Sequence, residues 1–339
     1  MNRQAPTLED VAREAGVSRA TVSRVVNGVR NVDPAIQDLV RSAIERTGYT
    51  PNRAARALVT RRTGTVALII SGAGDAFAGR VFTDPFFGRV VDGVMGYLRA
   101  RTMQPVLLFA ESEAARSQVV DYVGQGSADG ALVVSVHPDD PLPGMLLSAR
   151  VPTVLFARPA RETPVSCVDL DHYAGGRLAA EHLLARGCRR TAALGAPREL
   201  GAGRARLAGF RDALARAGHA SAPTAEGTFT LDSGAAAMTA LLQDHPTVDG
   251  VFAANDLMAQ GACQVLRERG RRIPDDVAVV GFDDSSVAVT CRPPLTTVRQ
   301  PVEDMAAAMA RMLDEQVQGI CTEPRTLVFA PELVVRASA

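Results

Sequence analysis

The sequence predicts two parts, a small all-α head and a larger α/β body built of two lobes with parallel sheets. Three observations predict this division. Apolar residues in the first 48 positions recur at helical spacing, with no run typical of a strand. From residue 65 onward, short apolar runs alternate with amphipathic stretches, which is typical of parallel sheets covered on both faces. This second part holds about 275 of the 339 residues, so we expect two lobes rather than one.

The first helix of the head is marked at both ends. Thr7 is a typical N-cap residue with Asp10 three positions after it, and Gly16 breaks the helical run. One apolar stripe lies between these ends and consists of Leu8, Val11, Ala12 and Ala15.

Two further helices complete the head. Ser18 is expected to cap the second helix, in which Val22 and Val25 face the core. The third helix is expected to open at Asp33, because Pro34, the next residue, suits the first helical position. It is expected to end at Gly48.

The spacing of the buried positions after residue 8, with small Ala12 at the helix crossing and Gly16 at the turn, is the pattern of a helix-turn-helix. An ordinary helical hairpin is the alternative. The second helix of a helix-turn-helix enters the major groove of DNA. Arg19 and Arg24 can each offer two donors to guanine, Ala20 can contact a thymine methyl, and short hydroxyls suit phosphates. The head residues expected to bind DNA are Thr7, Ser18, Arg19, Ala20, Thr21, Ser23, Arg24 and Asn27.

The charge distribution agrees with a polyanionic partner for the head. Residues 1–62 contain eleven arginines against six acidic residues, whereas acidic residues predominate in the remainder. Every basic residue is arginine. The absence of lysine excludes a phosphate loop that ends in Gly-Lys-Ser/Thr, a Schiff-base lysine and a Ser-x-x-Lys nucleophile.

Other classes of protein are disfavoured by the remaining composition. The five cysteines and five histidines show no metal-ligand spacing, so we expect no metal and no cofactor. No Gly-x-Ser-x-Gly motif is present, and an enzyme is not expected. No apolar run is long enough to span a bilayer, and the polar first ten residues do not resemble a secretion signal, so we expect a cytoplasmic protein that makes no membrane contact.

The body is expected to contain strands at residues 66–70, 106–109, 131–135, 153–156, 191–194, 251–254 and 277–282. The expected domains are the head at 1–48, a linker at 49–63 that is rich in apolar and basic residues, and the body at 64–339. The glycine-rich segment 71–79 follows the first of these strands. Its third glycine is too distant for a dinucleotide-binding loop, and we interpret residues 71–83 as a loop at the mouth of a cleft.

Residues 7–28, TLEDVAREAGVSRATVSRVVNG, closely resemble the LacI/GalR family of bacterial transcription regulators. Residues 49–58, YTPNRAARAL, are similar to the family's hinge, which forms a short helix on operator DNA. The resemblance implies that Leu58 inserts into the central minor groove and that Asn52 and Ala55 lie beside it. An apolar wedge of this kind kinks DNA. The alternative for Leu58 is packing within a domain linker.

The resemblance continues through nearly the whole body and implies a periplasmic-binding-protein-like, two-lobed effector domain. The segments that carry it are DPFF (84–87), VDLDHYAGGR (168–177), RLAGF (206–210), ANDLMA (254–259), PDDVAVVGFDD (274–284) and PLTTVRQP (294–301). The chain is then expected to cross between lobes near residues 160, 290 and 323. His172 and Cys188 stand where the family commonly has asparagine and histidine.

Ligands of such sheets bind beyond the carboxyl ends of the strands, where several polar residues fall. Arg206 and Asp256 are the first candidates for effector contact, because arginine and carboxylate groups can grip vicinal hydroxyls. The remaining candidates are Asn255, Asp283 and Arg158, with Phe86 and Phe229 as flat faces for a sugar ring. Packing in the core is the alternative for each aromatic residue.

The expected function is a DNA-binding repressor whose operator affinity is controlled by a small effector, with a sugar or oligosaccharide favoured by the resemblance. The alternatives are a purine-type effector, or a sugar-binding protein or enzyme on the same fold that does not bind DNA. One head reads half of a site, so a near-palindromic double-stranded operator and a homodimer are expected. The chain ends at residue 339 shortly after a strand-like run, and no leucine-heptad tail for a tetramer is expected.

Overall fold

A computed structural model describes residues 6–26, 32–50, 62–72, 77–101, 103–135, 139–159, 161, 163–219 and 222–339. The chain divides into two compact units. The larger unit contains Thr65–Gln125 and Asp129–Ala339, and the head belongs to the smaller one. No helix in the described ranges is both long enough and apolar enough to cross a bilayer.

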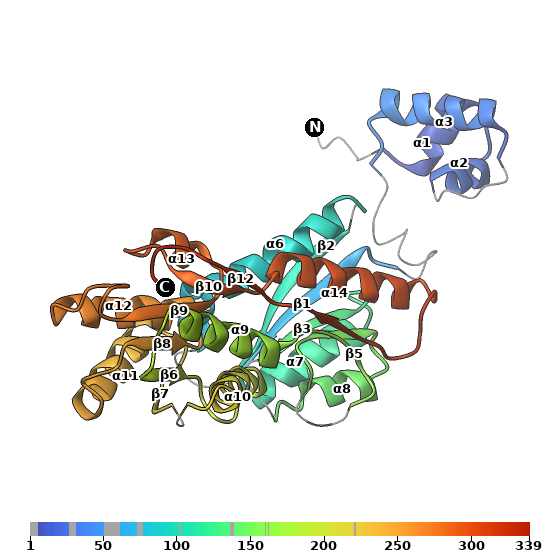
Figure 1. The fold of residues 1–339 in the computed structure, drawn as a ribbon. Helices are drawn as coiled ribbons and strands as arrows, with labels where there is room; N and C mark the ends of the chain where they lie inside the picture. Colours follow the sequence, from blue (N-terminus) through green and yellow to red (C-terminus); the bar gives the residue numbers. More distant parts are fainter. Residues whose placement is uncertain are drawn as a thin grey trace. The chain divides into compact units, whose positions relative to one another are not determined.

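The head contains the three expected helices, α1 (Leu8–Ala15), α2 (Arg19–Val26) and α3 (Pro34–Thr47) (Figure 1). Thr7 and Asp10 form a reciprocal capping box at the start of α1, and Gly16 ends that helix at φ 66°. Asp33 caps α3, and Gly48 ends it in the same left-handed conformation. The core of the head consists of Val11, Ala12, Val22, Val40 and Ala43.

The first lobe of the body contains a parallel sheet in the order β11-β5-β4-β3-β1-β2. Its strands are β1 (Thr65–Ser71), β2 (Gln104–Ala110), β3 (Ala131–Ser135), β4 (Thr153–Phe156), β5 (Ser166–Leu170) and β11 (Thr326–Phe329). Its helices are α5 (Phe77–Thr83), α6 (Pro85–Arg99), α7 (Glu113–Gly124), α8 (Leu142–Ser148) and α14 (Val302–Val317). The segment interpreted as a loop therefore includes helix α5. Its short, glycine-interrupted sequence has no clear apolar stripe.

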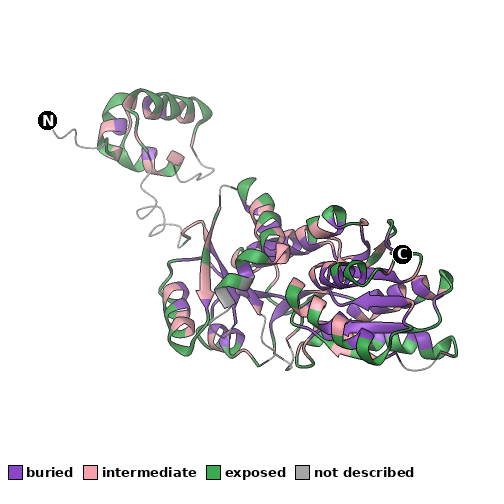
Figure 2. Cartoon of the chain, turned by 90° about the vertical axis from the view of Figure 1, so that its left-hand side faces the viewer, coloured by how far each residue is buried: buried purple, intermediate pink, exposed green. Residues whose placement is uncertain are grey.

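The second lobe contains a sheet in the order β12-β10-β9-β8-β6-β7. Its strands are β6 (Thr191–Gly195), β7 (Thr224–Glu226), β8 (Gly250–Ala253), β9 (Ala278–Asp283), β10 (Thr296–Arg299) and β12 (Glu332–Val334). Its helices are α9 (His172–Ala185), α10 (Gly201–Arg216), α11 (Leu231–Asp244), α12 (Asp256–Glu268) and α13 (Ser286–Thr290). Strand β12 pairs with β10 in the antiparallel direction, and the other recorded pairs are parallel. Figure 2 shows the central strands of this lobe buried beneath helices with exposed outer faces.

The chain passes between the two sheets after β5, after β10 and after β11, at about residues 171, 300 and 330. The expected positions near 160, 290 and 323 are each too early. Strands β5 and β10 are short and carry polar residues, so they lack the continuous apolar run that is typical of the expected strands. Strand β11 (TLVF) has the same residue types as β4 (TVLF), but it is not among the expected strands. Each of these three strands is the last one before a crossing. Because none of them is among the expected strands, the expected crossings lie closer to the N-terminus than the observed ones.

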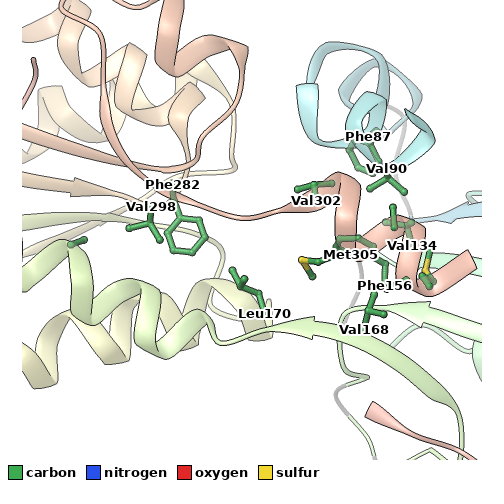
Figure 3. Packing of buried hydrophobic residues seen from close by; sticks show 14 of the residues in the cluster. Phe87, Val90, Val134, Phe156, Val168, Leu170, Phe282, Val298, Val302 and Met305 are labelled. Carbon is green, nitrogen blue, oxygen red and sulfur yellow. The ribbon is translucent and has the colours of Figure 1, made fainter. Parts of the chain in front are cut away.

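One apolar cluster extends through both lobes. Figure 3 shows Phe282 and Val298 of the second lobe on one side of Leu170, and Phe156 and Met305 of the first lobe on the other. Since all five side chains are nearly inaccessible to water, their burial stabilises the connection between the lobes.

Two pairs of helices approach closely through glycine. A Cβ atom on Gly176 of α9 would lie 1.8 Å from the backbone oxygen of Arg206 on α10, and one on Gly209 would lie 1.9 Å from the oxygen of Tyr173. A Cβ atom on Gly93 of α6 would lie 2.3 Å from the oxygen of Glu303 on α14. The close packing of α9 against α10 sets the position of Arg206. The close packing at Gly93 brings α6 against the beginning of α14.

Candidate ligand-binding cavity and helix-turn-helix surface

A cavity of about 710 Å³ lies within the body and is lined by residues of both lobes. Its volume is in the range of small-molecule sites. Six of the seven expected effector residues line it: Phe86, Arg158, Arg206, Phe229, Asn255 and Asp283.

The cavity lies beyond the carboxyl ends of strands, as parallel sheets require. Arg158 follows β4, Asn255 follows β8 and Asp283 ends β9. The backbone is strained at this edge, because Ala157, Phe229 and Asp283 adopt φ values of 76°, 64° and 106°. Side chains rarely accept such conformations unless the surrounding structure enforces them, and they often occur at functional sites.

Arg206 is held by four acceptors. Its Nε donates to His172 Nδ1 at 3.3 Å, its Nη1 to the oxygen of Ala254 at 2.6 Å and its Nη2 to Gln300 Oε1 at 3.1 Å. Nη1 also lies 3.5 Å from Asp283 Oδ1. The guanidinium carbon of Arg206 is 3.6 Å from the centre of the Phe282 ring, so this ring packs against one face of the guanidinium group.

Burial changes the titration of the groups around this arginine. Burial, aided by the nearby charge of Arg206, lowers the pKa of His172 well below its usual value. The imidazole is therefore neutral at pH 7, and its hydrogen is on Nε2 because Nδ1 accepts from Arg206. Burial raises the pKa of Asp283, and Arg206 opposes that shift in part. A raised carboxyl pKa in a cavity is typical of ligand-binding and catalytic sites.

Asp256 is not among the residues that line the cavity, and its expected effector contact stays a prediction. Its Oδ1 accepts from the hydroxyl of Thr297 at 2.6 Å, and its Oδ2 accepts from the backbone and hydroxyl of Ser285 at 2.8 and 3.0 Å. The carboxylate fits over Gly281, where a Cβ atom would be 2.5 Å away. Asp256 thus ties α12 to two neighbouring segments of the second lobe.

Asn255 reaches the cavity with its polar atoms already engaged. Its Oδ1 accepts from the backbone of Met258, as an N-cap does, and its Nδ2 donates to the oxygen of Phe229 at 3.0 Å. It therefore positions Phe229. Arg158 lies at the rim, with 61% of its side chain exposed, 3.5 Å from Asp169.

Phe86 is half-buried and is one of the residues that line the cavity. The ring packs edge-on against Phe87 at 5.2 Å and Phe156 at 5.3 Å between centroids. Phe86 therefore lines the cavity and also packs against the apolar core, and its contact with an effector stays a prediction.

Several lining residues were not proposed from the sequence. Gln300 is one of them, and its Oε1 accepts from Arg206. Its place in the PLTTVRQP segment, directly after a strand, is the signal that could have identified it. Four further aspartates, Asp84, Asp140, Asp169 and Asp171, come from loops and strand ends whose convergence the sequence does not reveal.

The outer face of α2 carries the residues expected to read DNA. Arg19, Ala20 and Arg24 are exposed, whereas Thr21 and Ser23 are half-buried. Arg19 Nε lies 3.0 Å from Glu9 Oε1, an exposed pair that a competing anion can displace. The exposed Ser18 hydroxyl accepts from the backbone of Thr21, and Thr7 holds its capping box. The remaining expected contacts, Asn27, Asn52, Ala55 and Leu58, lie outside the described residues.

Within the described ranges, no group of three or more histidine, cysteine or acidic side chains is arranged to hold a metal ion. The cavity presents hydrogen-bonding groups, charged groups and aromatic faces.

Comparison with known proteins assigns both units. Residues 7–52 match the model of the lacI family of bacterial regulatory proteins, and residues 180–339 match that of a periplasmic binding protein-like domain. The HTH-type transcriptional regulator CelR of Thermobifida fusca is 48% identical, over 99% of both chains. The ribose operon repressor of Escherichia coli K12 is 32% identical, over 98% of this chain and 99% of that protein.

Two solved structures are similar over almost the whole chain. A complex of the regulator CelR with cellobiose is 46% identical with a TM-score of 0.77, covering 98% of this chain and 100% of that one. The lac repressor dimer bound to operator and the anti-inducer ONPF is 27% identical with a TM-score of 0.82, covering 99% of each chain. Given this full-length similarity and the matching helix-turn-helix, the chain belongs to the lacI family of bacterial regulatory proteins.

Proposed function

We propose that this protein is a transcriptional repressor, acting as a homodimer in the bacterial cytoplasm, whose affinity for operator DNA is controlled by an uncharged saccharide. The observation that carries the proposal is the cavity around Arg206, at the strand ends of a body joined to a helix-turn-helix head.

The composition of the cavity supports a saccharide. Charged and amide groups alternate with aromatic faces, the combination that hydroxyl-rich rings with apolar faces require. The complex of CelR with cellobiose, a protein 46% identical to this chain, makes a β-linked glucose disaccharide the first candidate. A purine-type effector is the second candidate, because a planar base can stack on the same aromatic faces.

The DNA-binding half rests on α2. We assign base contacts to Arg19 and Arg24, a thymine contact to Ala20, and phosphate contacts to the hydroxyls of the head. The dimer seen for the lac repressor on its operator supports a near-palindromic site. Two recognition helices then enter major grooves about 34 Å apart. Within the linker, we assign Leu58 as the minor-groove wedge, with Asn52 and Ala55 beside it.

The test uses the full chain. Operator DNA is selected from a random library, and its affinity is measured by fluorescence anisotropy with and without cellobiose, glucose or hypoxanthine. Calorimetry of each compound with the DNA-free protein measures binding directly. We expect cellobiose to bind and to change operator affinity. Failure to enrich any sequence would contradict the DNA-binding role, and a response to hypoxanthine alone would replace the saccharide by a purine.

A further inference from the structure

Arg89, on helix α6 of the first lobe, contacts the segments of the second lobe that carry Asp283 and Gln300. Its Nη1 donates to the backbone oxygen of Asp283 at 2.8 Å, and its Nη2 donates to the backbone oxygen of Gln300 at 3.0 Å. Only 17% of the side chain is exposed. None of the sequence motifs discussed above includes Arg89.

The same two residues are held on their side chains by Arg206. Asp283 Oδ1 is 3.5 Å from Nη1 of Arg206, and Gln300 Oε1 accepts from Nη2 at 3.1 Å. Two arginines from different lobes thus hold one pair of residues, Arg89 by the backbone and Arg206 by the side chains. The backbone oxygen of Asp283 also accepts from the backbone nitrogen of Gln300 at 3.4 Å, so the pair is linked internally.

Arg89 is itself anchored. Its Nε and Nη2 donate to the two carboxylate oxygens of Glu303, at the beginning of α14, at 2.6 and 2.8 Å. Gly93, one helical turn after Arg89, allows α6 to lie directly against α14 at this point. Burial lowers the pKa of Arg89, but its bonds to Glu303 and the charge of that residue reverse the effect and raise it. The guanidinium of Arg89 therefore remains charged. Its two terminal nitrogens donate to the backbone carbonyls of Asp283 and Gln300.

Helix α6 also begins at the cavity. Asp84 caps it, Phe86 in its first turn lines the cavity, and Phe87 packs in the interlobe cluster (Figure 3). A movement of Asp283 or Gln300 toward a ligand must stretch their bonds to Arg89 or move α6 with them. Packed elements of this kind shift between discrete arrangements rather than deforming gradually.

We propose that Arg89 is the positioning residue that couples occupation of the cavity to the first lobe, by fixing the backbone of Asp283 and Gln300 while Arg206 fixes their side chains. The inference rests on the proposed function, because it assigns a regulatory role within the same site. Arg89 does not line the cavity, so its effect on the ligand is indirect.

The test compares Arg89→Gln, Arg89→Lys and Arg101→Gln in the full-length chain. Arg101, two residues after the end of α6, is the matched control, because it pairs with Asp314 of α14 at 3.5 Å and donates to the backbone oxygen of Tyr97 on α6. The coupling measured is the ratio of operator affinities with and without cellobiose, which in allosteric proteins is typically about 5- to 150-fold. We expect Arg89→Gln to bring this ratio to within about twofold of unity and Arg101→Gln to preserve it.

Arg89→Lys separates the carbonyl contacts from the ion pair with Glu303. A compact ammonium can pair with the carboxylate but cannot span both carbonyls as a planar guanidinium does. We therefore expect Lys to leave coupling impaired. Full restoration by Lys would reduce Arg89 to an ion-pairing role and overturn the proposal, as would normal coupling in Arg89→Gln.

A second measurement needs no effector and separates this inference from the proposed function. Hydrogen–deuterium exchange of the ligand-free protein should become faster in peptides that cover residues 283–287 and 299–303 in Arg89→Gln, and should not change there in Arg101→Gln. Unchanged exchange in Arg89→Gln would overturn the positioning role, even if cellobiose proves not to be the effector. A wild-type protein that ignores cellobiose, with faster exchange in Arg89→Gln, would contradict only the choice of ligand.

Discussion

The arginines of α2 and the arginine of the cavity are the same side chain in opposite environments. Arg19 has 68% of its side chain exposed and is paired with exposed Glu9, whereas the side chain of Arg206 is 6% exposed and meets four acceptors of its own chain. An exposed guanidinium is available for a partner that arrives from outside, such as DNA. A buried, saturated guanidinium instead fixes the groups that contact it. The difference shows that residue type alone does not indicate whether an arginine binds a ligand or organises a site.

The largest effect in this comparison is expected at Arg206. Arg206→Ala leaves the acceptors of Gln300 and Asp283 buried without a donor, and we expect a stability loss of about 3–5 kcal/mol together with loss of the effector response. Chemical denaturation and calorimetry with cellobiose measure the two effects. Arg204→Ala is the matched control, because Arg204 also lines the cavity but is exposed. Equal stability of both variants would show that the contacts of Arg206 are not energetically important.

The buried carboxyl of Asp256 provides a test by pH. Burial raises its pKa to about 6, above the 3.8 of an ordinary aspartate. Folded protein then holds the proton in a pH range where unfolded protein has released it, so this group's stabilising contribution is complete below pH 3.8 and is lost as pH rises through 6. We expect the stability difference between wild type and Asp256→Asn to fall by about 3 kcal/mol over that window.

Denaturation curves at several pH values measure this difference, and calorimetry with cellobiose accompanies them. Asp256→Asn should bind the effector with nearly wild-type affinity, since Asp256 does not line the cavity. If the variant is as stable as wild type but does not bind, Asp256 contacts the ligand after all.

For the exposed arginines, we expect Arg24→Ala to weaken the free energy of binding to the selected operator by about 1–3 kcal/mol, because a guanine contact is lost. Binding to random DNA should be weakened much less. Fluorescence anisotropy at one salt concentration compares the two DNAs. Arg41→Ala is the control, because Arg41 is also an exposed arginine of the head and is paired with Asp38 on α3. Similar losses on both DNAs would reassign Arg24 to a phosphate contact.

The smallest effect is expected at the capping box. Thr7→Ala removes the side-chain oxygen that accepts from Asp10, and we expect a loss of about 1 kcal/mol that is confined to the head. Hydrogen exchange of the full chain measures the result, with faster exchange in α1 and no change in the body. A general increase throughout the body would show that the head and body do not unfold independently.

The sequence predicted elements well where one local rule was sufficient. The head helices follow from cap residues, from Gly16 and Gly48, and from spacings of three and four. The seven strands recognised in the body have apolar runs, and all seven are present. The missed strands β5, β7, β10, β11 and β12 occupy the outer positions of the two sheets. Pairing that depends on a distant segment leaves little trace in the local sequence.

The sequence by itself determined the division into head and body, the helix-turn-helix with its outward arginines, and the set of strand ends from which a cavity can be built. Local spacing and chain connectivity are sufficient for these. Only the tertiary structure decided which polar side chains face the cavity. Asp256 and Asp283 each follow a buried apolar run, yet Asp256 turns onto Gly281 and is saturated by Ser285 and Thr297, whereas Asp283 faces the cavity beside Arg206. The reason is physical: a buried carboxylate must find donors, and which donors are near depends on how distant segments pack.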